Sequence, residues 1–251
     1  EMKNQVGGMC RSWKWRDFYV DTGPHIFHTS DINLWKLWKE LFKKNLIEGE
    51  YKAKNIIGEN FEKYIDYPLS NEAISRFPID KKKIILKELK EAKDNKSKYT
   101  RNFKEHVISQ IGPTLQKMFF EGYPEKVWGI QTSQMTSDWA PKRIIFTNKS
   151  IPFFNKEKTG VGKFGTGQLY EIIKNKILKK KGKLFLNHKV VKINHKKNFI
   201  NSIEFSNKKK INFDKDDVII SSLPINLTSK FLGHPSKLQF RGIRSIYISL
   251  K

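Results

Sequence analysis

Cysteine is almost absent from this chain, because Cys10 is the only one among 251 residues. A single thiol cannot form an internal disulfide, which excludes a disulfide-held secreted scaffold and fits the reducing cytoplasm. Apolar runs of about eighteen residues, long enough to cross a membrane, are also missing. No G-x-S-x-G motif occurs, so the usual elbow of a serine hydrolase of the α/β type is excluded as well.

Arginine and acidic residues are scarce beside lysine. The formal net charge is +24, from 49 basic and 25 acidic residues, and lysine runs occur at 81–83, 179–181 and 208–210. Lysine spread over the whole chain is typical of a solvated surface, whereas recognition of bases and phosphates favours arginine. We therefore expect no nucleic-acid partner, and we retain a basic nucleic-acid-binding module as the alternative of another class.

The chain does contain the apolar material of a globular protein, with 38% hydrophobic and 13% aromatic residues. A period-two pattern over 18–21 predicts a strand that ends before Gly23-Pro24. From residue 31 the spacing changes to three and four, which predicts a helix with Ser30 or Asp31 as its N-cap.

Further along, the pattern alternates between helices and strands. Residues 64–78 indicate a strand and a proline turn, and residues 80–123 indicate helix with a break at Gly112-Pro113 and a loop over 93–98. Residues 124–154 are rich in turns. A glycine turn then precedes a helix around 169–177, and short strands are expected at 183–193, 199–206 and 210–214. The last strand, over 217–224, is continuously apolar, as in a strand buried on both faces.

The opening "EMKNQVGGMCR" combines an acidic residue with a glycine pair. A carboxylate such as Glu1 can accept hydrogen bonds from both ribose hydroxyls of a dinucleotide, and Gly7-Gly8 would let the backbone approach a pyrophosphate. Arg11 would supply positive charge to that pyrophosphate. A glycine pair by itself indicates only a tight turn, so the surrounding motifs decide its meaning.

In this context, Glu1 followed by Gly7-Gly8 resembles the second glycine motif of flavin amine-oxidase-type oxidoreductases. "VDTGPHIFHTSD" at 20–31 is similar to the family segment that passes the flavin ring, in the UDP-galactopyranose-mutase-like branch. The segments 121–144, 165–177, 186–193, 200–205 and 216–225 resemble later parts of the family in the same order. The segment 121–144 is similar to one found in the protoporphyrinogen-oxidase-like and the mutase-like members.

The resemblance implies an α/β fold with a discontinuous Rossmann-like FAD-binding domain and an inserted mixed α+β substrate domain. The implied boundaries are 1–29 and 160–226 for the FAD-binding domain, 30–159 for the substrate domain, and 227–251 for the start of a return to the latter. It further implies that the chain is part of a longer enzyme, because the first strand, its glycine turn and the C-terminal Gly-Asp motif of the family have no counterpart here.

The resemblance also implies FAD as the cofactor and a small molecule as the substrate, and it names no catalytic residue. The implied activity is hydride transfer between a substrate carbon and flavin N5. The alternative within the family is a mutase in which reduced flavin attacks a sugar carbon. His25 and His28 lack a third ligand nearby, so no metal site is expected. The expected cofactor-binding residues are Glu1, Gly7, Gly8, Met9, Arg11, Ser12, Gly23, Pro24, His25, Val190 and Ser221.

Overall fold

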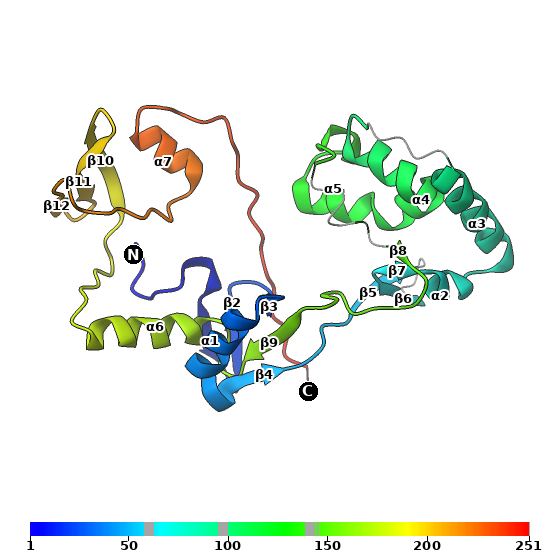
Figure 1. The fold of residues 1–251 in the computed structure, drawn as a ribbon, viewed down its shortest axis with the longest axis horizontal. Helices are drawn as coiled ribbons and strands as arrows, with labels where there is room; N and C mark the ends of the chain where they lie inside the picture. Colours follow the sequence, from blue (N-terminus) through cyan, green and yellow to red (C-terminus); the bar gives the residue numbers. More distant parts are fainter. Residues whose placement is uncertain (58–62, 95–99, 139–143, 145, 251) are drawn as a thin grey trace. The chain divides into compact units, whose positions relative to one another are not determined.

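A computed structural model describes residues 1–57, 63–94, 100–138, 144 and 146–250 (Figure 1). The chain divides into two compact units. Unit 1 comprises residues 1–27, 31–47 and 160–251, and unit 2 comprises residues 28–30 and 48–159. Residues 31–47, expected in the substrate domain, belong to unit 1, because the first long helix packs there through an aromatic cluster.

Unit 1 contains short strands and three α-helices within its described residues. Its elements are η1 (Gly8–Cys10), β1 (Ser12–Trp15), β2 (Phe18–Asp21), α1 (Ile32–Phe42), η2 (Lys43–Asn45), α6 (Gly167–Lys179), β10 (Val190–Lys196), β11 (Phe199–Phe205), β12 (Lys210–Asn212) and α7 (Ile225–Phe231). Strands β3 (Phe27–Thr29), β4 (Leu46–Glu48) and β9 (Lys158–Gly162) contain the residues at which the chain passes from one unit to the other.

Two antiparallel sheets lie wholly within unit 1. Strands β1 and β2 form a hairpin in which Ser12 faces Asp21, and β10, β11 and β12 form a meander in that order. Helix α1 begins at the predicted cap, since the Asp31 carboxylate accepts hydrogen bonds from the backbone N–H groups of Asn33 and Leu34. Its core-facing side packs in a small cluster of buried residues: Phe27, Phe42 and Leu169.

The prediction of a strand at 217–224 is wrong. These residues form neither strand nor helix, and Val218 and Ile220 are 87% and 91% exposed. A parallel strand buried on both faces needs a neighbouring strand on each side, and no described strand of unit 1 lies along this segment. Residues 234–250 are likewise without regular structure, and several of their apolar side chains are exposed.

Unit 2 consists of a helical layer and short strands. Its elements are β5 (Ala53–Ile57), β6 (Lys63–Tyr67), β7 (Leu69–Ser70), α2 (Asn71–Ser75), α3 (Ile79–Asp94), α4 (Phe103–Phe119), α5 (Gly122–Trp128), η3 (Thr132–Gln134) and β8 (Phe146–Thr147). Strands β5 and β6 pair antiparallel, and β7 pairs parallel with β8. Figure 1 shows α3 and α4 side by side. One continuous core joins these elements, with Phe103, Val107, Ile111 and Leu115 of α4 at its centre.

The predicted break in the long helical segment is confirmed at Gly112, whose φ is 82° within α4. The second half of α4 begins at the expected Pro113, and α3 supplies the cap. The Glu88 carboxylate accepts hydrogen bonds from Thr114 N at 2.9 Å and Thr114 Oγ1 at 2.8 Å. The loop expected at 93–98 lies mostly outside the described residues, and Lys93 and Asp94 end α3.

Within the described residues, no helix has the length and apolar character needed to cross a membrane.

Candidate functional site

The glycine pair near the start of unit 1 forms an open turn. Gly7 and Gly8 have φ of 103° and 53°, values that favour glycine. Cys10 N donates to Gly7 O at 2.8 Å, and Arg11 Nε donates to Gly8 O at 2.8 Å. No atom lies within 4 Å of where a Cβ of Gly8 would stand, so this side of the turn is accessible. Met9 beside it is 68% exposed.

Glu1 is exposed and lies beside the chain that leads into β10. Its main-chain oxygen accepts from His188 N at 2.8 Å, and its amino group donates to Phe185 O at 3.0 Å. The carboxylate accepts from Lys3 N at 2.9 Å and remains open to solvent. Two of the expected cofactor residues, Glu1 and Val190, therefore belong to neighbouring chain segments, although they are far apart in the sequence.

Ser12 is buried and holds unit 1 together. Its hydroxyl bonds to the Asp21 carboxylate and accepts from Gly167 N at 2.7 Å. The same carboxylate accepts from Thr166 N at 3.1 Å and Thr166 Oγ1 at 2.6 Å. We call these four residues (Ser12, Asp21, Thr166 and Gly167) the α6 clip. The clip fastens the β1–β2 hairpin to the start of α6, so the Ser12 hydroxyl is already used inside the protein.

The segment expected to pass the flavin ring follows β2 directly. His25 is half-buried, and its Nδ1 is a buried polar atom without a hydrogen-bond partner among the described residues. Gly23 is open: its nearest contacts for an added Cβ would be His25 Cε1 and Ser245 Oγ, both at 3.9 Å. Pro24 is exposed. Ser221 lies in the exposed segment 217–224, where its hydroxyl accepts from Leu223 N at 3.3 Å.

Tyr170, on α6, is a neighbour of the glycine turn that sequence reasoning missed. A Cβ on Gly7 would stand 3.3 Å from its ring. A hydrogen bond with the Cys10 thiol, together with partial burial, raises the pKa of Tyr170 to about 12. Tyr170 is therefore neutral at physiological pH, and it forms one wall of the turn. The helical spacing of α6 gave no signal for this role.

Unit 2 contains an open cavity of about 920 Å³ whose wall is mostly apolar and includes the aromatic rings of Tyr67, Trp128, Phe153 and Phe154. Its lining residues are His28, Tyr67, Pro68, Trp128, Ile130, Gln134, Met135, Thr136, Ile151, Phe153, Phe154, Asn155 and Glu157. Tyr67 and Phe153 lie 5.6 Å apart between ring centroids, and Phe153 and Phe154 lie 4.8 Å apart. Such a cavity, mostly apolar with a few polar groups, has the character of a small-molecule site.

One ionisable pair stands at this cavity. His28 Nδ1 lies 2.6 Å from Glu157 Oε2, and the His28 ring stacks on Phe154 with a centroid distance of 3.9 Å. Both side chains remain partly exposed, His28 at 44% and Glu157 at 32%. The motif at 20–31 drew attention to His28 as part of a flavin-facing segment, but nothing in the sequence connected it with a residue 129 positions away.

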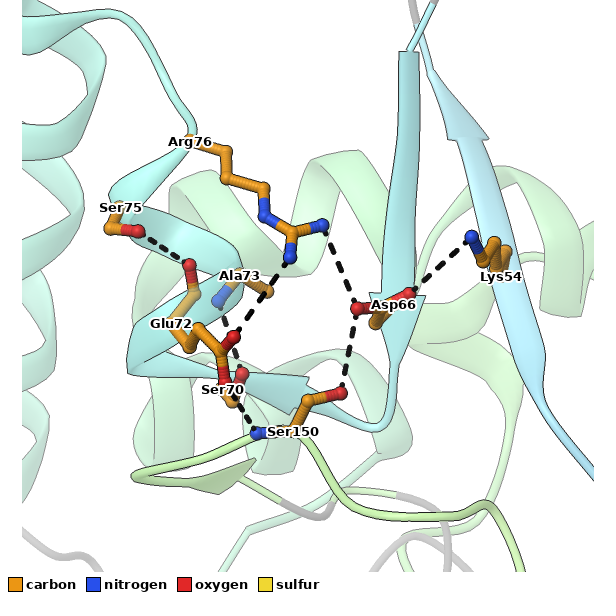
Figure 2. Close-up of polar contacts among 8 residues, drawn as sticks. All are labelled: Lys54, Asp66, Ser70, Glu72, Ala73, Ser75, Arg76 and Ser150. Atoms are coloured by element: carbon orange, nitrogen blue, oxygen red, sulfur yellow. Dashed lines mark hydrogen bonds and ion pairs between the residues drawn. The ribbon is translucent and has the colours of Figure 1, made fainter. Parts of the chain in front are cut away.

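A polar cluster beside the cavity anchors the segment that carries Phe153 and Phe154 (Figure 2). Asp66 on β6 forms ion pairs with Arg76 at 3.6 Å and with Lys54 at 3.9 Å. Ser150 N donates to Glu72 Oε2 at 3.2 Å, and Arg76 also reaches Glu72 at 3.9 Å. Since Ile151 follows Ser150 and lines the cavity, this cluster fixes one edge of the aromatic wall.

Among the residues that the structure describes, no group of three or more His, Cys, Asp or Glu side chains lies close enough together to hold a metal ion.

Comparison with known proteins gives a family and a set of relatives. The family described as flavin containing amine oxidoreductase matches residues 1–247. A probable UDP-galactopyranose mutase of Klebsiella pneumoniae is 25% identical over 180 residues, covering 69% of this chain and 45% of the relative. A dTDP-fucopyranose mutase of Escherichia coli is 23% identical over 180 residues, covering 69% of this chain and 46% of the relative. The chain thus spans about half the length of these curated relatives.

Solved structures give the same indication for the fold. The crystal structure of a reduced UDP-galactopyranose mutase matches with a TM-score of 0.77 at 20% identity, over 92% of this chain and 50% of that chain. A protein from Pyrococcus furiosus matches with a TM-score of 0.59 at 20% identity, over 92% of this chain and 54% of that chain. The chain therefore has the mixed α/β fold of UDP-galactopyranose mutase.

Proposed function

Because the chain belongs to the flavin-containing amine oxidoreductase family, we propose that it is part of an FAD-dependent enzyme that acts on a nucleotide-activated sugar. The proposed reaction is a mutase reaction, the interconversion of the pyranose and furanose forms of the sugar. Both curated relatives named above are mutases of a nucleoside-diphosphate hexopyranose. The observation that carries the proposal is the large, mostly apolar cavity of unit 2 in a chain with such relatives.

The residues of unit 1 fit a dinucleotide cofactor. The Gly7-Gly8 turn has left-handed backbone angles and an open face, and the exposed Glu1 carboxylate can accept ribose hydroxyls. The unpaired Nδ1 of His25 lies on the segment proposed to pass the flavin ring. We propose that the cofactor is held by Glu1, Gly7, Gly8, Met9, Arg11, Ser12, Gly23, Pro24, His25, Val190 and Ser221, and that Ser12 acts through its backbone because its hydroxyl belongs to the α6 clip.

The two units then have separate tasks. In this proposal residues 1–29 and 160–226 bind the cofactor, except that His28 lines the cavity of unit 2, and most of 30–159, with that cavity, binds the substrate. The flavin supplies the redox-active ring when it is bound. The aromatic rings in the wall of this cavity offer flat apolar faces to the C–H face of a sugar. The amides of Gln134 and Asn155 and the hydroxyl of Thr136 can pair with sugar hydroxyls.

A direct test uses the protein produced from its complete gene. We expect a yellow protein with a flavin absorption spectrum that, once reduced with dithionite, converts UDP-galactopyranose into the furanose form, measured by chromatography or proton NMR. A colourless protein that takes up no flavin on reconstitution contradicts the proposal at its base.

Glu1→Ala in the same protein examines the cofactor half of the proposal. Hydrogen bonds to charged groups contribute about 1.5–3 kcal/mol each, so FAD affinity is expected to fall by roughly tenfold or more, while the unfolding midpoint changes little because Glu1 is exposed. The matched control is Glu91→Ala, which removes another exposed carboxylate, on α3, and should leave FAD affinity unchanged. Unchanged FAD affinity in Glu1→Ala would show that the dinucleotide motif has been misassigned.

The second candidate function is hydride transfer between a substrate carbon and flavin N5. The description of the matching family favours it. The two functions differ in electron balance, because a mutase regenerates its flavin state in each turnover and an oxidoreductase consumes an acceptor. Substrate-dependent oxygen uptake or dye reduction, without formation of the furanose, would favour the oxidoreductase.

A further inference from the structure

The positive charge of the protein is concentrated in unit 1. Unit 1 has 28 basic and 10 acidic residues, whereas unit 2 has 21 basic and 15 acidic residues. Unit 1 therefore carries +18 of the formal net charge of +24. An excess of this size on one unit attracts anionic partners and raises the rate at which they associate.

The β1–β2 hairpin of unit 1 presents aromatic rings to solvent. Phe18 is 54% exposed, and Trp13 and Tyr19 are nearly as exposed. Phe164, two residues after β9, packs edge-on against Tyr19, with 5.2 Å between the ring centroids. Exposed rings that gather in this way mark an interaction surface, whereas isolated ones are common on any protein.

Basic side chains alternate with these rings. The guanidinium of Arg16 lies 5.2 Å from the centroid of the Trp15 ring, and Lys163 Nζ lies 5.7 Å from the centroid of the Phe164 ring. Lys14, between the two tryptophans of β1, is exposed. Among the described residues, none of these three cations forms an ion pair with an acidic side chain.

The hairpin surface, as we call the hairpin together with residues 163–164, projects from a fixed base. The two-residue turn Arg16-Asp17 joins the two strands, which are paired right up to it. At the other end, Ser12 and Asp21 belong to the α6 clip. Asp17 is the one acidic residue of the surface outside the clip. A surface held at its base in this way loses little conformational freedom when it binds a partner.

The mixture of rings and cations indicates which partner the hairpin surface fits. The core of a protein–protein interface is depleted of lysine, so another protein is a poor match. Stacking of nucleic-acid bases needs free ring faces, and one face of Trp15 and one of Phe164 already lie under a cation. At the surface of a bilayer, by contrast, aromatic rings lie among the headgroups while Lys and Arg pair with anionic lipids.

We propose that the hairpin surface binds a lipid bilayer that contains anionic headgroups, and that it holds the protein at the membrane surface. The rings around the turn enter the headgroup region, and Lys14, Arg16 and Lys163 pair with the anionic headgroups. The remaining charge of unit 1 adds an attraction that salt screens. The proposal involves neither the cofactor nor the substrate, so it is independent of the proposed reaction.

Sedimentation with vesicles tests the proposal on the protein produced from its complete gene. We expect binding to vesicles of phosphatidylglycerol and phosphatidylcholine in equal parts, weaker binding as sodium chloride is added, and no binding to vesicles of phosphatidylcholine alone. A protein that does not sediment with the anionic vesicles would overturn the proposal.

A charge variant assigns the binding to the hairpin surface. Lys14→Gln combined with Arg16→Gln should weaken binding by on the order of twentyfold, because each basic residue at an anionic leaflet contributes about fivefold. The matched control is Lys81→Gln combined with Lys83→Gln, which removes the same charge from the exposed side of α3 in unit 2 and should change binding little.

A ring variant tests the apolar contribution. Phe18→Ser should weaken binding about threefold to tenfold, as expected for a ring that leaves water only in part. Its control is Tyr123→Ser on α5, which changes a side chain that is 75% exposed and should have no effect. Equal losses in the variants and their controls would show that overall charge binds the vesicles, and would overturn the role of the hairpin surface.

Two further measurements separate the bilayer from other partners. Lipids with brominated acyl chains should quench the tryptophan fluorescence of the bound protein, and Trp13→Phe combined with Trp15→Phe should remove most of this quenching while binding persists. A single-stranded oligonucleotide, titrated in parallel, should bind more weakly than the vesicles and equally to Phe18→Ser and the unchanged protein. Unquenched tryptophans, or an oligonucleotide that binds more tightly than the vesicles and loses affinity in Phe18→Ser, would contradict the proposal.

Discussion

The two units use their apolar side chains differently. In unit 2 the buried residues form one core that runs from β6 through α2, α3 and α4 to Met135. In unit 1 the main cluster is Phe27, Phe42 and Leu169, and apolar residues from 218 to 250 are largely exposed. Unit 2 is nearly continuous in sequence, whereas unit 1 is assembled from three separate segments. Helices that are neighbours in sequence can close a core locally, while a sheet depends on partners that are distant along the chain.

The strongest test of this contrast compares a buried apolar side chain of unit 2 with an exposed apolar side chain of unit 1. Phe103→Ala in unit 2 removes a side chain that is 1% exposed, and should lower the free energy of unfolding by about 3–5 kcal/mol. Ile220→Ser in unit 1 changes a side chain that is 91% exposed, and should alter it by less than about 0.5 kcal/mol. Urea denaturation followed by tryptophan fluorescence measures both. Similar losses would mean that residues 217–224 are packed in solution.

A second, intermediate effect is expected where unit 1 relies on polar contacts in place of a core. Asp21→Ala leaves the clip donors of Ser12 and Thr166 without an acceptor, which costs about 1–3 kcal/mol for a buried donor. The amides of Thr166 and Gly167 should exchange their hydrogens faster in the variant, as measured by NMR. Asp17→Ala in the exposed turn of the same hairpin is the control. Unchanged exchange rates in Asp21→Ala would show that the clip does not hold α6.

The smallest effect is expected at an exposed ion pair of unit 2. Hydrogen bonds from the Arg101 side chain and backbone lower the pKa of Glu105 from its usual value. A lowered folded pKa stabilises the protein above the unfolded pKa, and this stabilisation disappears as the pH falls through the folded pKa. Arg101→Gln should raise the pKa of Glu105 in a carbon NMR titration, with little change in stability near neutral pH because the pair lies at the surface, where solvent screens the charges.

The control for this titration is Lys104→Gln. The Lys104 ammonium binds Glu121, so its loss should leave the titration curve of Glu105 unchanged. A Glu105 curve that does not move in Arg101→Gln would contradict the assigned cause.

Local features of the fold could be predicted from the sequence. The start of α1 at Asp31 and the break in α4 at Gly112 were both read from residue types whose backbone preferences act within one turn. The strand at 217–224 could not be judged in the same way. Its apolar pattern describes what the segment would do beside neighbouring strands, and the pattern itself does not say whether such strands are present.

The candidate site also has features that local residues determine and features that depend on contacts between distant segments. The open glycine turn could be predicted from Gly7 and Gly8 alone. Their positive φ angles are a local backbone preference of glycine and depend on no residue distant in the sequence. The cavity of unit 2 depends on contacts between distant segments, such as His28 with Glu157 and Ser150 with Glu72. Neither contact has a periodicity or spacing that a single sequence could reveal. Ser12 was predicted as one of the cofactor-binding residues that the family resemblance implies, and its link to Gly167 emerges only in three dimensions.

The kink of α4 restricts how this protein can vary during evolution. A Cβ on Gly112 would stand 2.5 Å from Cβ of Glu88, and the Glu88 carboxylate caps Thr114. Replacing Gly112 alone creates a clash that only the loss of the whole Glu88 side chain, Cβ included, would relieve, and that loss removes the cap, so each single step is disfavoured. Positions 88 and 112 therefore form an epistatic pair, in which substitutions should be inherited together or not at all.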